Sequence, residues 1–196
     1  MPSELAALAL EPTVSQTVGP FFHLGLAWLF SDQVVEAGTP GRHITIGGRI
    51  LDGDGVPVPD ALLEIWQADA NGRYPQPHVQ GEARPTPGFK GYARIPTDDA
   101  GAFRFRTVQP GRVPAPDGGM QAPHISVQIF MRGLLRPLLT RTYFADEPAN
   151  RGDLVLDRVP ESRRGTLLAI PRPGQIDAFE WNVVLQGPDE TVFFDG

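Results

Sequence analysis

Apolar and polar residues alternate with a period of two along several short stretches of the chain, which predicts β-strands with two different faces. The clearest of these stretches is 124–131, in which Ile125, Val127, Ile129 and Met131 alternate with His124, Ser126, Gln128 and Phe130. A second clean alternation, at 102–107, predicts that Phe103 and Phe105 point inward while Arg104 and Arg106 point outward.

Further strands are predicted at 42–51, 61–68, 138–144, 166–170, 179–185 and 191–194. The strand at 61–68 is apolar enough to be buried on both faces. Two long loops, 74–90 and 109–119, and the charged segment 161–164 lie between strands. Many short strands separated by turn signals predict an all-β fold, a β-sandwich that needs almost no helix.

The N-terminal segment 1–40 reads as an extended arm of a single domain that spans 1–196. Thr17, Gly19 and Pro20 cannot continue a helix, and Gly19 allows another chain to approach the backbone closely. An ordinary connecting loop is the alternative interpretation. The aromatic run 21–30 is too apolar for exposure to water, so it belongs to the core or to an interface.

Composition narrows the possible chemistry. The chain has 196 residues and no cysteine, which excludes disulfides, iron–sulfur clusters and thiol nucleophiles. The net charge of −6 comes without a basic stripe, so nucleic acid is a poor candidate, and an anionic ligand needs a local cation. The first residues do not resemble a signal peptide and the run 21–30 is too short to cross a bilayer, so a cytoplasmic protein is expected.

The strand at 124–131 carries an incomplete metal motif. His124 and Ser126 share one face of this strand, roughly 6–7 Å apart, which is the arrangement of a His-x-His metal pair with the second imidazole replaced by a hydroxyl. The four histidines are far apart in sequence. Any one of them is more often a packed or surface histidine than a ligand.

Several motifs together resemble those of the intradiol ring-cleaving dioxygenases. They are GRILDGDGVPVPDALLEIWQADANGRY, FRFRTVQPG, APHISVQIF and TRTYF, which lie between Gly48 and Phe144. The segments SQTVGPF and ETVFFDG and the chain length resemble the alpha chains of family members that are built from two homologous subunits. The resemblance implies a β-sandwich of mixed topology, and O2-dependent cleavage of an aromatic catechol carboxylate.

The family also implies a ferric ion held by two tyrosines and two histidines. Carried over position by position, these ligands fall on Gly81, Val113, His124 and Ser126, so three of the four positions have lost the family's ligand. The placement at Gly81 assumes a loop without gaps. The arginine that precedes the first histidine in catalytic members becomes Gln121. Glycine and valine offer no donor atom, and a phenol near pKa ~10 ionises at neutral pH only beside a cation. The resemblance therefore implies that Fe(III) is bound by a homologous beta subunit.

In such a pair the alpha chain lends its partner's pocket an arginine and a Gly-Pro segment. These match Arg132, Gly19 and Pro20, with Thr17 nearby. Eight residues of extended strand, roughly 26 Å, separate His124 from Arg132. Arg132 is therefore too far away to line the cavity beside His124, but it can line a pocket of the neighbouring subunit. From the residues alone, a surface ion pair is the simpler interpretation of Arg132. A non-catalytic, transthyretin-like β-sandwich binding module is the alternative function.

Overall fold

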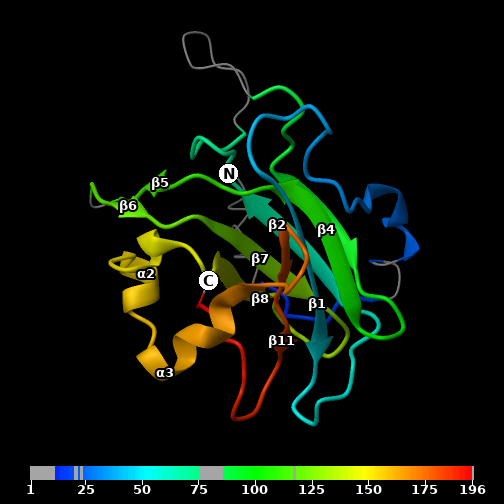
Figure 1. Ribbon diagram of the computed structural model, residues 1–196. Helices are drawn as coiled ribbons and strands as arrows, with labels where there is room; N and C mark the ends of the chain where they lie inside the picture. The colour runs from blue at the N-terminus through cyan, green and yellow to red at the C-terminus, as the bar shows by residue number, and fades with distance from the viewer. Residues whose placement is uncertain (1–11, 20–21, 23, 76–85, 117, 196) are drawn as a thin grey trace, which may run out of the picture.

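The computed structural model describes residues 12–19, 22, 24–75, 86–116 and 118–195 (Figure 1). In chain order the strands are β1 (His43–Leu51), β2 (Leu62–Gln67), β3 (Tyr92–Pro96), β4 (Ala102–Val108), β5 (Val113–Pro114), β6 (Met120–Gln121), β7 (His124–Phe130), β8 (Leu138–Phe144), β9 (Leu168–Pro171), β10 (Ala178–Glu180) and β11 (Val183–Val184). The helical pieces are short: η1 (Ala27–Leu29), η2 (Pro148–Asn150), α2 (Leu154–Asp157), α3 (Glu161–Arg164) and η3 (Gly165–Leu167). The predicted all-β class is confirmed.

Nine of the described strands form one mixed sheet that wraps around a common core, and β5 and β6 form a separate two-stranded sheet. The order of the mixed sheet is β11-β1-β10-β9-β8-β7-β2-β3, and β4 pairs with the other edge of β1. β9 belongs to both halves, because it runs parallel to β8 and antiparallel to β10. β3 ends this path, and β4, which lies outside the path beside β1, contacts β3. The sheet is therefore nearly closed on itself.

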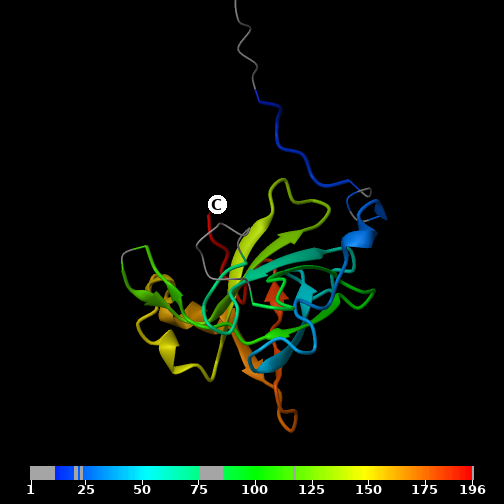
Figure 2. The same ribbon diagram turned by 90° about the horizontal axis from the view of Figure 1, so that it is seen from above.

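The later part of the arm, residues 31–34, bridges β3 and β4. The amide of Ser31 donates to the carbonyl of Arg94 on β3, and the amide of Val34 donates to the carbonyl of Arg106 on β4, both at 3.0 Å. Seen from above, the arm and the loop between β7 and β8 project on the same side of the sheet (Figure 2).

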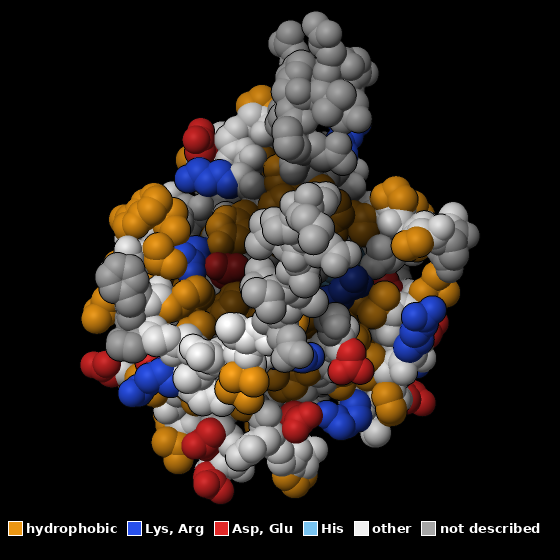
Figure 3. Space-filling model, turned by 180° about the vertical axis from the view of Figure 1, so that it is seen from behind, with side chains coloured by type: hydrophobic (Ala, Val, Ile, Leu, Met, Phe, Trp, Pro, Cys, Tyr) orange, Lys and Arg blue, Asp and Glu red, His pale blue; other side chains and the backbone are white. Residues whose placement is uncertain are grey.

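The core follows the predicted alternation. Phe103 and Phe105 of β4 are buried while Arg104 and Arg106 are exposed. The core also contains Ile46, Ile65, Val127, Ile129, Phe144 and Phe179. Because side chains alternate across a strand, the residues of β2, β7 and β8 that alternate with these core residues lie on the opposite, outer face of the sheet. Figure 3 views the molecule from behind, where the surface is hollowed and apolar side chains gather in its depth.

Several details of the structure differ from the sequence predictions or add to them. The stretch 179–185 forms two short strands, and 191–194 forms only an isolated bridge between Phe194 and Leu139. Strand β3 was not predicted, and the charged segment 161–164 forms one turn of helix. β2 is not buried on both faces, since Trp66 is 41% exposed. Among the described residues, no helix is long and apolar enough to span a membrane.

A glycine in β1 makes the contact with the segment after β10 possible. A Cβ atom built on Gly48 would lie 1.7 Å from the carbonyl oxygen of Trp181, a backbone atom that cannot move aside. Trp181 is itself held, since its amide donates to the carbonyl of Gly47 at 3.0 Å. We expect Gly48→Ala to lower the free energy of unfolding by at least the ~1–3 kcal/mol typical of overpacking.

Gly38→Ala is the matched control for this prediction, because a Cβ atom there meets nothing within 4 Å. Urea denaturation of both variants measures the difference. Equal stability of the two variants would contradict the packing argument.

Candidate functional site

The N-terminal arm and the loop after β7 meet where three predicted site residues lie. Oγ1 of Thr17 accepts a hydrogen bond from the amide of Gly133 at 2.9 Å and lies 3.5 Å from the carbonyl oxygen of Met131. A groove of about 250 Å³ is lined by Gly19, Arg132 and their neighbours. The structure thus brings Thr17, Gly19 and Arg132 together, while Pro20 lies outside the described residues.

Arg132 is exposed and ion-paired. Its Nε donates to a carboxylate oxygen of Asp60, and its side chain is 73% exposed against 31% for that of Asp60. Exposed ion pairs contribute only about 0–1 kcal/mol, so this contact positions the guanidinium more than it stabilises the fold. The interpretation of Arg132 as a surface ion pair therefore holds within this chain, and the exposed remainder of the guanidinium faces the groove.

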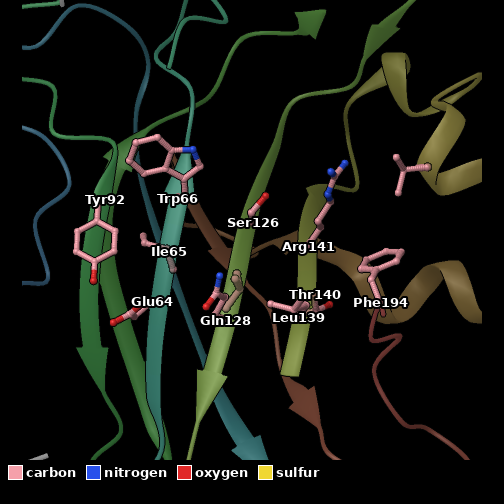
Figure 4. Close-up of a pocket in the computed structure, with 12 residues that line it drawn as sticks. Glu64, Ile65, Trp66, Tyr92, Ser126, Gln128, Leu139, Thr140, Arg141 and Phe194 are labelled. Carbon is pink, nitrogen blue, oxygen red and sulfur yellow. The ribbon is translucent and has the colours of Figure 1, made fainter. Parts of the chain in front are cut away.

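A second pocket lies on the outer face of β3, β2, β7 and β8. Its volume is about 360 Å³, and it is closed on one side by Val155 of α2 and by Phe194 (Figure 4). The strand register places four of its residues in one transverse row, because Trp66 pairs with both Tyr92 and Ser126, and Ser126 pairs with Arg141. Nη1 of Arg141 donates to Oε1 of Gln121 at 2.8 Å.

His124 occupies the buried end of this face. It is 3% exposed, and its Nδ1 lies 2.8 Å from the carbonyl oxygen of Ala122. Burial lowers the pKa of His124, and the charge of Arg141 lowers it further. The imidazole is therefore neutral at neutral pH. Val113 is buried in β5, opposite Gln121 of β6, and Gly81 lies outside the described residues.

A buried carboxylate supports this end of the site. Asp153 caps α2 by accepting from the amides of Val155 and Leu156 at 3.0 and 2.9 Å. It also accepts from the amide of Ala122 at 2.6 Å and from the hydroxyl of Tyr143 at 3.3 Å. Burial, followed by the charge of Asp153, raises the pKa of Tyr143 to about 12. Tyr143 consequently remains a neutral phenol that fixes α2 against β8.

Comparison with known proteins identifies the family. A family model described as "Dioxygenase" matches residues 19–187. The chain is 42% identical to the protocatechuate 3,4-dioxygenase alpha chain of Burkholderia cepacia, over 95% of this chain and 98% of the relative. The chain belongs to the intradiol dioxygenase family. It is also 32% identical to the protocatechuate 3,4-dioxygenase beta chain of the same organism, over 90% of this chain and 77% of the relative.

Solved structures agree with this family fold. The dioxygenase domain of a dioxygenase–carbohydrate-binding protein fusion from Streptomyces sp. SirexAA-E superposes with a TM-score of 0.60, covering 97% of this chain and 98% of that domain at 24% identity. The likeness shows that the two chains share one fold.

The described positions that the resemblance assigns to the iron ligands offer a single imidazole. Val113 has no donor atom and Ser126 offers only a hydroxyl, whereas His124 could still bind a metal through Nε2 while its Nδ1 contacts a carbonyl. The part of the chain that the structure describes contains no group of three or more His, Cys, Asp and Glu residues that could hold a metal. Burial raises the pKa of each of the chain's three tyrosines, Tyr74, Tyr92 and Tyr143.

Sequence reasoning missed three residues of these sites. Asp60 pairs with Arg132 across 72 positions of sequence, and Trp66 and Arg141 reach the pocket only through the strand register. The alternation of 138–144 does place Arg141 on the face opposite the buried Thr140 and Thr142. That signal was present in the sequence, but which strand lies beside Arg141 could not be read from it.

The lowered pKa of His124 predicts a pH-dependent stability. The unfolded chain binds a proton on this imidazole near pH 6.5, whereas the native chain does so only at lower pH. Below that pH the unfolded state holds more protons, so the free energy of unfolding falls as pH decreases, by at most about 1.4 kcal/mol per pH unit. We expect His124→Gln to flatten the pH dependence between 7.5 and 5.5.

Urea denaturation across this pH range tests the expectation. The exposed His43 provides the control, because His43→Gln leaves the buried imidazole in place. If the free energy of unfolding of the His124 variant changed with pH as steeply as that of the wild type, His124 would not be the group that takes up the proton.

Proposed function

We propose that this chain is the iron-free alpha subunit of a protocatechuate 3,4-dioxygenase. The reaction is the O2-dependent intradiol cleavage of protocatechuate (3,4-dihydroxybenzoate) to 3-carboxy-cis,cis-muconate. A homologous beta subunit holds the Fe(III) ligands, and this chain completes the substrate pocket. The observation that carries the proposal is the near full-length similarity to an alpha chain, at 42% identity, against 32% to the beta chain of the same organism.

The contribution of this chain to the pocket is a cation held beside the arm. Arg132 is exposed at the end of β7, and Thr17 ties the arm to the same loop. Two aromatic contacts anchor the segment that follows Gly19 and Pro20. The rings of Phe22 and Phe130 lie 5.1 Å apart, and the guanidinium of Arg94 lies 5.0 Å from the ring of Phe22. These contacts fix the arm beside the loop after β7, and that loop can present the guanidinium of Arg132 to a ligand held by a partner.

Arginine suits this task because its planar fork matches a carboxylate, whereas lysine would act as a point charge. The acidic chain carries a net charge of −6, so a substrate carboxylate needs this local cation. Asp60 keeps the guanidinium in place and shares it with the incoming carboxylate. Family membership favours this function over the transthyretin-like binding module.

The first prediction from this proposal concerns iron. Because the ligand positions carry valine, histidine and serine where described, the chain expressed alone should bind no ferric ion and show no dioxygenase activity. Metal analysis and the visible spectrum of the purified chain decide the point. Stoichiometric iron with a tyrosinate-to-iron absorption band would refute it. In the assembled enzyme, His124→Ala should leave activity nearly unchanged.

The second prediction concerns Arg132. A hydrogen bond to a charged group contributes about 1.5–3 kcal/mol, so its loss weakens binding roughly ten- to a hundredfold. Loss of a contact that is equally strong in the ground and transition states raises KM and leaves kcat little changed. On this basis, Arg132→Ala in the co-expressed complex should raise KM for protocatechuate while the iron content stays the same. Catechol, which lacks the carboxylate, should be nearly indifferent to the change.

Arg136→Ala is the matched control, since Arg136 is an exposed arginine of the same loop. Steady-state kinetics with both substrates separate the outcomes. Equal losses for protocatechuate and catechol would mean that Arg132 holds the subunit interface and not the ligand.

A further inference from the structure

The pocket on the outer face of β3, β2, β7 and β8 contains a cation that the proposed function does not use. Ser126 and Arg141 are directly paired across β7 and β8, and the next residue of the row is Trp66 on β2. Adjacent strands lie roughly 4.8 Å apart, so the backbones of Arg141 and Trp66 are separated by about two strand spacings. In Figure 4 Ser126 lies between these two side chains. The short serine side chain leaves room between them.

None of the ion pairs among the described residues includes Arg141. Its guanidinium donates to the neutral amide oxygen of Gln121 and also hydrogen-bonds the neutral phenol of Tyr143. Arg141 is half-buried, so part of its hydration is lost already. An uncompensated guanidinium in a concave site favours a carboxylate that can take up both arms of its fork.

The carboxylate in the same pocket is already compensated. Oε1 of Glu64 lies 2.9 Å from Nε of Arg94, an ion pair whose members are 24% and 4% exposed. Tyr92 also hydrogen-bonds Glu64, and burial together with that carboxylate raises the pKa of Tyr92 to about 12. Glu64 therefore does not neutralise Arg141, but its residual negative charge opposes a second negative charge on a ligand. The pocket favours a monoanion over a dianion.

The remaining walls are apolar or aromatic. Trp66 stacks on Tyr74 with ring centroids 5.8 Å apart and an interplanar angle of 3°, which fixes one wall as a flat surface. Val155 and Phe194 form the opposite side. Pockets of this size that bind small molecules typically combine apolar walls with a few placed polar groups. A flat apolar body with one carboxylate matches this combination.

We propose that this pocket is a second ligand site, which binds a small aromatic monocarboxylate with its carboxylate on Arg141 and its ring between Trp66 and Phe194. The described residues that line this pocket belong to this chain, and the site goes beyond the proposed function. Arg141 replaces the charge that a metal ion would bring to this face, and Ser126 provides the space that a second imidazole would fill.

Isothermal titration with benzoate tests the site, and benzamide serves as its uncharged analogue. The full wild-type chain should bind benzoate at least tenfold more tightly than benzamide, while Arg141→Met should bind the two equally. Arg136→Met, an exposed arginine outside the pocket, should keep the wild-type preference. The proposal would be overturned if wild type and Arg141→Met preferred benzoate over benzamide to the same degree. It would also be overturned if the wild-type chain bound inorganic phosphate as tightly as benzoate.

A space-filling variant covers the case in which Arg141→Met does not fold. Ser126→Phe keeps the cation but fills the space beside it, and it should abolish benzoate binding while thermal unfolding shows a cooperative transition. Retained benzoate affinity in folded Ser126→Phe would also overturn the site.

Titration of the co-expressed complex separates this proposal from the proposed function. The complex should show two classes of benzoate site, of which Arg141→Met removes one and Arg132→Ala weakens the other. A single class that responds only to Arg132→Ala would refute the Arg141 site and leave the proposed function standing. A single class of site that responds only to Arg141→Met would support the Arg141 site and refute the role of Arg132 in the proposed function.

Discussion

The pairing of β7 with its two neighbours is the constraint on which the rest of the structure depends. β7 lies between β2 and β8, and both pairings are antiparallel. Since successive side chains point to opposite faces, this register sends Ile125, Val127 and Ile129 into the core and Ser126 to the outer face. A slip of one residue would bury the polar row and expose the apolar one. The burial of the core thus also fixes which residues can meet in the pocket.

Asp153 extends this constraint to the helical segment. It accepts four hydrogen bonds, two from the first turn of α2, one from Ala122 before β7, and one from Tyr143 on β8. A buried carboxylate is tolerated only when its oxygens are satisfied in this way. Because these partners come from three segments, α2 cannot move without breaking contacts on both strands. Val155 is therefore held at the wall of the pocket.

The sequence was a good guide where one strand decides the outcome and a poor one where two strands must be aligned. The alternation at 102–107 predicted the inward phenylalanines, and the alternation at 124–131 predicted that His124 and Ser126 share the face opposite the core. β3 was missed because the Pro-rich stretch before it obscured its start. The strand predicted at 179–185 is interrupted where Trp181 crosses over Gly48, a contact that depends on distant residues.

Electrostatics connects the two arginine sites with the iron chemistry of the family. A ferric ion and its phenolates stabilise each other, so a chain that loses the phenolates also loses the reason to hold the metal. Here the face keeps a positive charge in another form, because Arg141 stands beside Ser126 and helps to keep His124 neutral. A guanidinium needs no phenolate and stays charged at any physiological pH. A fixed organic cation on this face therefore suits the carboxylate of the proposed second ligand site, and it requires none of the imidazole and oxygen donors that a ferric ion needs.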